Sequence, residues 1–120
     1  MTHPKIVVDQ SFTNQTAALA ETTVFTPSND GTFTILLINN NSPFNTSGSL
    51  GVAALTTTNE FGTVETENPS SVGNSGGLVS QSTKTYRLKS GQPVQVSASL
   101  QGPGSITYDI YIVIMQLELD

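Results

Sequence analysis

The chain has 120 residues, enough for one domain with a substantial core. Only 11% of its residues are charged and 36% are hydrophobic, so Ser, Thr, Asn and Gln make up the balance. Nine acidic and four basic residues give a net charge of -5, without the broad basic surface that a nucleic-acid backbone requires. We therefore expect a single folded domain over residues 1–120 that does not bind nucleic acid directly.

The absence of cysteine excludes disulfides, thiol nucleophiles and thiolate metal sites. The N-terminal stretch MTHPKIVVDQSF has no long apolar run after its lysine, which argues against a signal peptide. No stretch reaches the ~18–20 apolar residues of a membrane-spanning helix. These features favour synthesis in a cytoplasm and no contact with a membrane.

The apolar stretches are rich in Val, Ile, Thr, Phe and Tyr, and Gly, Pro, Asn and Ser separate them, which predicts β-strands throughout. In chain order we expect strands near residues 5–12, 16–25, 32–39, 49–58, 61–66, 78–88, 93–101 and 105–118. A short helix over 15–24 is the alternative, but the β-branched run of Thr22, Thr23 and Val24 argues against it. Residues 39–49 and 68–77 are predicted polar loops. About eight strands without helices predict an all-β, antiparallel β-sandwich that is jelly-roll-like.

Residues that could support catalysis or metal binding are few. The only histidine, His3, lies near the terminus without an evident partner. Three nearby glutamates, Glu60, Glu65 and Glu67, could offer oxygen ligands to calcium, but no Asp-rich loop accompanies them. Asp109 is either a buried acid or, as we favour, a residue near the rim of a strand or paired with Lys or Arg. We expect no enzyme activity, no catalytic residue, no metal and no cofactor.

Two strands are apolar on both faces. In YDIYIVIMQLELD, residues 108–120, alternate positions on each face are hydrophobic, and FTILLIN, residues 33–39, has the same character. A sandwich core covers only one face of each sheet, so the second face requires another cover, which could be loops or another copy of the subunit. We favour a subunit interface, formed by Leu36, Ile38, Tyr111, Val113 and Met115, although alternation alone leaves open which face meets the core.

Three stretches carry a resemblance to a known family. The stretch TVFTPSNDGTF, residues 23–33, resembles the opening motif F-T-x-P-x-x-G-x-Y/F of trimeric jelly rolls of the tumour-necrosis-factor and complement globular-head type. LKSGQPV, residues 88–94, is similar to their L-x-x-G-x-x-V turn, and residues 108–119 are similar to their last apolar strand. The same order of features resembles small β-sandwich proteins encoded by bacteriophages and prophages. The resemblance implies a trimer around a threefold axis with a structural or adhesive role.

Two functions are compatible with these features. The favoured one is a non-enzymatic structural protein of a virion, either a capsid decoration protein or a fibre or tail component. It would be made in the host cytoplasm and would bind itself, as a homotrimer, and other virion proteins. The alternative is a carbohydrate- or receptor-binding module that uses Phe44 and Phe61 in polar loops to contact a glycan or receptor. The absence of tryptophan weighs against the alternative.

Overall fold

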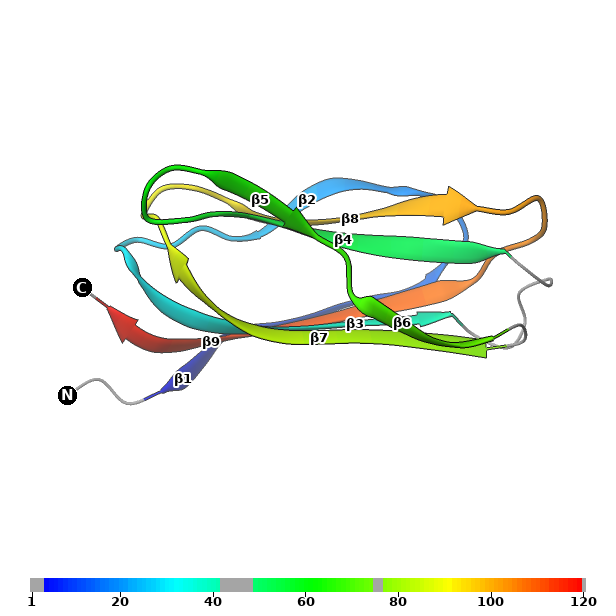
Figure 1. The fold of residues 1–120 in the computed structure, drawn as a ribbon, viewed down its shortest axis with the longest axis horizontal. Coiled ribbons are helices and arrows are strands. Elements are labelled where there is room, and N and C mark those ends of the chain that lie inside the picture. The colour runs from blue at the N-terminus through cyan, green and yellow to red at the C-terminus, as the bar shows by residue number, and fades with distance from the viewer. Residues whose placement is uncertain (1–3, 42–48, 75–76, 120) are drawn as a thin grey trace.

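The computed structural model describes residues 4–41, 49–74 and 77–119, which form two antiparallel β-sheets packed face to face (Figure 1). The strands of these residues are β1 (Lys5–Gln15), β2 (Leu19–Phe25), β3 (Gly31–Asn41), β4 (Leu50–Thr58), β5 (Val64–Glu67), β6 (Ser70–Asn74), β7 (Gly77–Leu88), β8 (Val94–Gln101) and β9 (Tyr108–Leu119). None of the described residues is helical, so the helix alternative over 15–24 is wrong. The predicted all-β antiparallel sandwich is confirmed.

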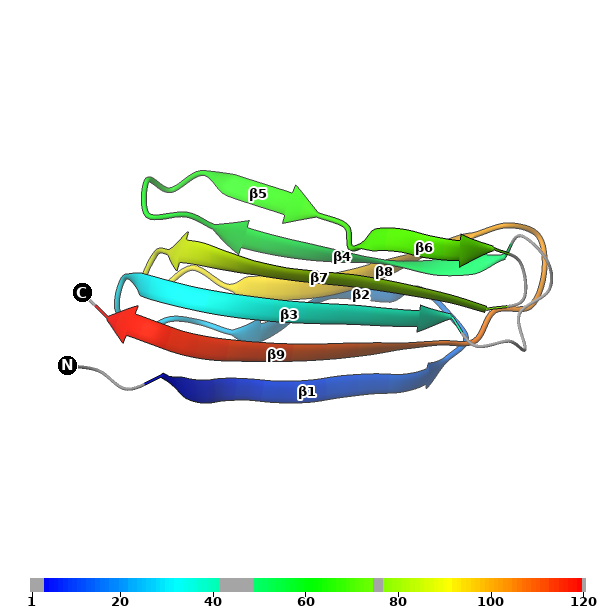
Figure 2. The ribbon, with the colours of Figure 1, turned by 60° about the horizontal axis from the view of Figure 1, so that its bottom comes forward.

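The strands are nested from the two ends of the chain inward. One sheet has the order β1-β9-β3-β7-β6 and the other has the order β2-β8-β4-β5 (Figure 2). The first strand therefore pairs with the last, β2 pairs with β8, and β3 pairs with β7, while β4 pairs with β5 across a short turn. This nesting of antiparallel pairs over two sheets is jelly-roll-like. The sequence left the strand connectivity open, and the strand pairing decides it.

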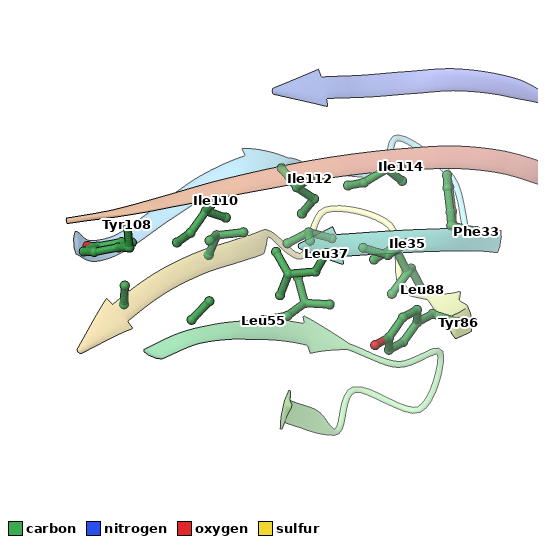
Figure 3. Packing of buried hydrophobic residues seen from close by; sticks show 14 of the residues in the cluster. Phe33, Ile35, Leu37, Leu55, Tyr86, Leu88, Tyr108, Ile110, Ile112 and Ile114 are labelled. Atoms are coloured by element: carbon green, nitrogen blue, oxygen red, sulfur yellow. The ribbon is translucent and has the colours of Figure 1, made fainter. Parts of the chain in front are cut away.

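The core lies between the two sheets, and its composition shows which of the two apolar faces of β9 is buried. Ile110, Ile112 and Ile114 of β9 are fully buried and face the second sheet (Figure 3). They pack in one cluster with Phe33, Ile35 and Leu37 of β3, Leu55 of β4, and Val94 and Val96 of β8. Burial of each such side chain stabilises the fold by about 1.5–3 kcal/mol. The isoleucine face of β9 is therefore the core face, and its other face points outward.

The prediction of a polar loop over residues 68–77 is wrong in part. Residues 68–77 are not a continuous loop, because Ser70–Asn74 pairs with β7 as β6. The chain leaves the edge of β4 after Glu67 and crosses to the other sheet, where the backbone of β7 offers a free edge (Figure 1). The sequence SSVGN has weak strand propensity, so pairing with a neighbour decides its conformation. Of the other predicted loop, residues 42–48 lie outside the described residues, while Asn39–Asn41 continues β3.

Among the described residues, the first half of β4 has no neighbouring strand on one side, because β5 pairs only with Leu55–Thr58. Asparagine side chains form hydrogen bonds with its backbone there instead. Asn41 accepts a hydrogen bond from the Gly51 amide at 2.8 Å and donates to the Gly51 carbonyl at 2.9 Å, which imitates a neighbouring strand. Asn39 donates to the same carbonyl at 2.7 Å. Farther along, Asn68 donates to the Ala53 carbonyl at 2.8 Å. Since buried backbone groups without partners are costly, these amides hold the two sheets together where no strand does.

The ring of Tyr108 packs so closely against residue 51 that only glycine fits at this position. A Cβ at position 51 would lie 2.4 Å from Cδ1 and 2.6 Å from Cγ of that ring. The ring itself is fully buried, and its hydroxyl donates a 2.7 Å hydrogen bond to the Ala17 carbonyl between β1 and β2. Because both ends of Tyr108 are held, the ring has no room to retreat from a larger residue.

We predict that Gly51→Ala destabilises the protein by about 1–3 kcal/mol, the usual cost of overpacking a filled core. Urea denaturation followed by circular dichroism measures the free energy of unfolding. The same substitution in a Tyr108→Ala background should cost much less, because the two positions are in direct contact. Equal costs in both backgrounds would show that the clash is not the cause.

Candidate functional site

The five residues predicted at a subunit interface lie together on the outer face of the β1-β9-β3-β7-β6 sheet. Across the β3–β9 pair, Leu36 is opposite Val113 and Ile38 is opposite Tyr111, while Met115 is opposite Thr34. Their side chains alternate with the buried core residues of the same two strands, so they point away from the second sheet. No described segment lies over this face (Figure 1). We call this face, with these five residues at its centre, the outer face.

Exposure on the outer face is graded. Leu36, Ile38, Val113 and Met115 are half-buried by their neighbours within the sheet, and Tyr111 is 38% exposed. The sequence analysis missed one member, Ile6 on β1, which pairs opposite Met115 and is 58% exposed. A register shift between Ile6 and Val8 changes the alternation of β1 at this point. Sequence alternation alone does not reveal such a shift.

Polar side chains surround the apolar centre. On the β7 side, Thr83 is opposite Leu36 and Gln81 is opposite Ile38, and both are polar neighbours of the centre. Thr34 and Thr85 share a hydrogen bond between their hydroxyls at 3.0 Å. On the β1 side, Asp9 is opposite Val113 and Ser11 is opposite Tyr111. The outer face therefore has an apolar centre with a polar border on both sides.

Asp109 marks one end of the outer face. The residue is half-buried near the start of β9, as the favoured reading of the sequence predicted. Its carboxylate accepts a 2.7 Å hydrogen bond from the backbone N–H of Asn14 and a 3.3 Å bond from the Tyr111 hydroxyl. Asn14 has a positive φ of 55°, which asparagine tolerates better than most residues, and it lies in the register shift between Phe12 and Gln15 of β1. The negative charge of Asp109 raises the pKa of Tyr111, so that hydroxyl stays protonated over the ordinary pH range.

Phe61 lies on a separate surface, the turn between β4 and β5. Its side chain is 84% exposed, the largest value among the exposed large hydrophobic side chains of the described residues. Asn59 fixes the turn because its Oδ1 accepts hydrogen bonds from the amides of Phe61 and Thr63, at 2.9 and 3.0 Å. Gly62 supplies the positive φ of 84° that the turn requires. Phe44, the other predicted contact residue, and His3 lie outside the described residues.

The three glutamates that could have bound calcium take separate partners. Glu60 pairs with Arg87 at 3.2 Å, and Glu65 accepts a 3.0 Å hydrogen bond from Asn59. Glu67 pairs with Lys84 and accepts a 2.7 Å hydrogen bond from the Tyr86 hydroxyl. In the part of the chain that the structure describes, no three His, Cys, Asp or Glu residues gather as metal ligands. Glu60 and Glu67 instead connect the β4–β5 hairpin to β7, and Glu65 binds within the hairpin.

The Glu67 contacts predict how stability depends on pH. The hydrogen bond from Lys84 is the main cause that lowers the pKa of Glu67 below 4.5, and the bond from Tyr86 adds to it against the opposing effect of burial. A carboxylate with a lowered pKa stabilises the fold above its unfolded-state pKa, and the stabilisation is lost as pH falls through the folded-state value. Glu67→Gln should therefore be less stable than the unmutated protein near pH 7, and the difference should shrink below pH ~4.5.

Urea denaturation of both proteins at a series of pH values measures this difference. The backbone N–H of Ser90 also lowers the pKa of Asp30. Because Asp30 is present in both proteins, its contribution cancels in the difference between their free energies of unfolding. A difference that stays constant from neutral to acidic pH would show that the Glu67 charge contributes no stability.

Comparison with known proteins does not place the chain in a family. A scan against protein-family models found no match, and a search of curated proteins found none either. Among the described residues, no helix is long and apolar enough to cross a membrane.

Proposed function

We propose that this protein is a non-enzymatic structural component of a virion, a capsid decoration protein or a part of a fibre or tail, that assembles as a homotrimer through the outer face. The observation that carries the proposal is the apolar centre of that face, which the sandwich leaves uncovered. It comprises Leu36, Ile38, Tyr111, Val113 and Met115, extended by Ile6.

The composition of the outer face fits a protein–protein contact. Specific interfaces have an apolar centre, often with tyrosine and methionine, and a polar rim. Here Tyr111 and Met115 lie at the centre, and threonine and glutamine side chains of β7 lie at the border. A monomer gains nothing from apolar side chains on the solvent face of an antiparallel sheet, where polar residues ordinarily alternate with core residues.

The size of the outer face matches one ordinary protein–protein contact surface, which the two neighbours of a subunit in a trimer would share. The sheet has five strands, and β3 at its middle has 11 residues. With strands ~4.8 Å apart and a rise of ~3.3 Å per residue, the face measures roughly 800–900 Å². A specific interface of ordinary size buries about 800 Å² on each partner. The whole face, with its apolar centre and polar border, is therefore comparable with one standard contact surface.

The virion role rests on two further observations. The sequence resembles trimeric jelly rolls and small β-sandwich proteins of bacteriophages at residues 23–33, 88–94 and 108–119. Jelly rolls are frequent in viral capsid proteins, although they also occur in lectins, so the fold by itself does not choose a function. Sequencing the flanking genes tests this part independently. Portal, terminase or tail genes nearby would support it, and a polysaccharide-degradation cluster would contradict it.

The assembly part is tested by Val113→Lys. Light scattering coupled to size-exclusion chromatography should give about 38 kDa for the unmutated protein, three times the subunit mass of 12.6 kDa. The variant should give a folded monomer, because a lysine at the centre of the contact would lose its hydration on assembly. Asp9 lies directly opposite Val113, so the lysine has an acidic neighbour on the free subunit and folding should be preserved.

Two controls separate assembly from folding. Ile112→Lys places the same charge in the core and should unfold the subunit, since Ile112 is fully buried. Ser97→Lys places it on the outer side of the other sheet, where Ser97 is half-buried, and should leave the trimer intact. An unmutated protein that remains monomeric across micromolar concentrations would refute the assembly proposal.

The exposed Phe61 favours a second candidate, a glycan- or receptor-binding module. A rigid turn that presents an aromatic ring to solvent could stack on a sugar. Under the favoured proposal, Phe61→Ala should leave both the trimer and the free energy of unfolding unchanged, because the ring is 84% exposed. A glycan array probed with the unmutated protein and with Phe61→Ala separates the two candidates. Binding that Phe61→Ala abolishes, but Val64→Ala at a neighbouring exposed position retains, would favour the second candidate.

A further inference from the structure

A small cavity lies between the two sheets, beside the edge of β4 that the asparagine amides complete. Its volume is about 20 Å³. Backbone and side chains of residues 50–53 form one wall, and Asn39, Asn41, Pro69 and Ser80 form the remainder. Neither the outer face nor the Phe61 turn contributes to it, so the cavity is independent of the proposed assembly surface.

One buried polar atom next to this cavity has no partner. Asn39 is 3% exposed, and its Oδ1 accepts no hydrogen bond from the described residues. The orientation of the amide is determined by its other end, because Nδ2 donates to the Gly51 carbonyl at 2.7 Å. A flipped amide would set Oδ1 against that carbonyl, and two acceptors repel each other. Oδ1 is therefore an acceptor that needs a donor from outside the protein.

The size and chemistry of the cavity restrict the donor. A water molecule needs about 10–15 Å³ of such volume, whereas an organic ligand needs several times more. None of the lining residues is charged, so a cation would lose its hydration without a counter-charge. Ser80 lines the same cavity, and its hydroxyl group has two acceptor lone pairs in addition to its donor.

We infer that one structural water molecule occupies this cavity and donates a hydrogen bond to Asn39 Oδ1, with Ser80 as its second partner. Asn39 and Asn41 of one sheet form hydrogen bonds with the Gly51 backbone of the other sheet. The water supplies the hydrogen bond that Asn39 Oδ1 still lacks. It is bordered by residues of both sheets, and its hydrogen bond to the buried Asn39 side chain should make it exchange with solvent more slowly than surface water.

A crystal structure at a resolution that shows ordered waters is the first test. We expect one solvent peak ~2.7–3.2 Å from Asn39 Oδ1 in the unmutated protein. In solution, the Asn39 side-chain amide should show nuclear Overhauser cross-peaks to a long-lived water. An empty cavity, an amide that has rotated onto another partner, or a peak with the short contacts of a metal ion would each overturn the inference.

Two variants make the test independent of folding. Asn39→Leu removes the acceptor and should abolish the solvent peak in the crystal structure. If that variant fails to fold, Ser80→Ala keeps Asn39 and removes only the second partner. Ser80→Ala should then weaken the cross-peak or shorten the lifetime of the water, and an unchanged signal would exclude Ser80 as a partner and contradict the site as stated.

Discussion

The antiparallel pairing of β9 with β3 is the constraint on which the rest of the structure depends. These strands lie side by side in the middle of the larger sheet, with Leu37 opposite Ile112 in the core and Leu36 opposite Val113 outside. Because side chains alternate with a period of two, a slip by one residue would exchange the two faces. Both faces are apolar, so the hydrophobic effect alone distinguishes the two registers poorly. The fit of the isoleucines against β4 and β8 favours the observed one.

Polar interactions at the β4 edge complement this apolar core. Where the chain leaves β4 after β5 and crosses to the other sheet, three asparagine side chains supply the hydrogen bonds of the missing strand. The same region holds the close contact of Gly51 with the Tyr108 ring. The sheets are thus joined at this end by directional bonds and a steric fit, which specify one arrangement more narrowly than burial of apolar area does. A strand edge completed in this way also offers few free groups for pairing with another chain.

The two candidate contact surfaces are spatially distinct. The outer face is broad and runs along the middle of the larger sheet. Phe61 instead lies on the β4–β5 turn, at the end of the sandwich where β1 begins and β9 ends (Figure 2). A protein that uses the outer face to join copies of itself would still present the Phe61 turn to a further partner. The paired glutamates beneath the turn hold it against β7 in a defined position. Self-association and recognition of another molecule can therefore be altered separately by mutation.

The fold class, most strand positions and the two apolar faces of residues 108–119 could be predicted from the amino-acid sequence. These follow from local patterns, because alternation, β-branched residues and turn residues act over a few positions. The five residues proposed for the interface could be named for the same reason, since alternation groups them on one face once the core face is chosen.

Only the tertiary structure decided which face is the core, because that choice depends on contacts with β4 and β8, which are distant in sequence. It also decided that Ser70–Asn74 forms a strand, that Ile6 joins the outer face, and that Asn39, Asn41 and Asn68 complete the edge of β4. Each of these depends on another strand. The first needs the free edge of β7, the second the register between β1 and β9, and the third the unpaired backbone groups of β4. Asparagine in a polar stretch ordinarily predicts a loop. Here the unpaired backbone of another strand gives these asparagines a different role, and that backbone exists only after the two sheets have packed.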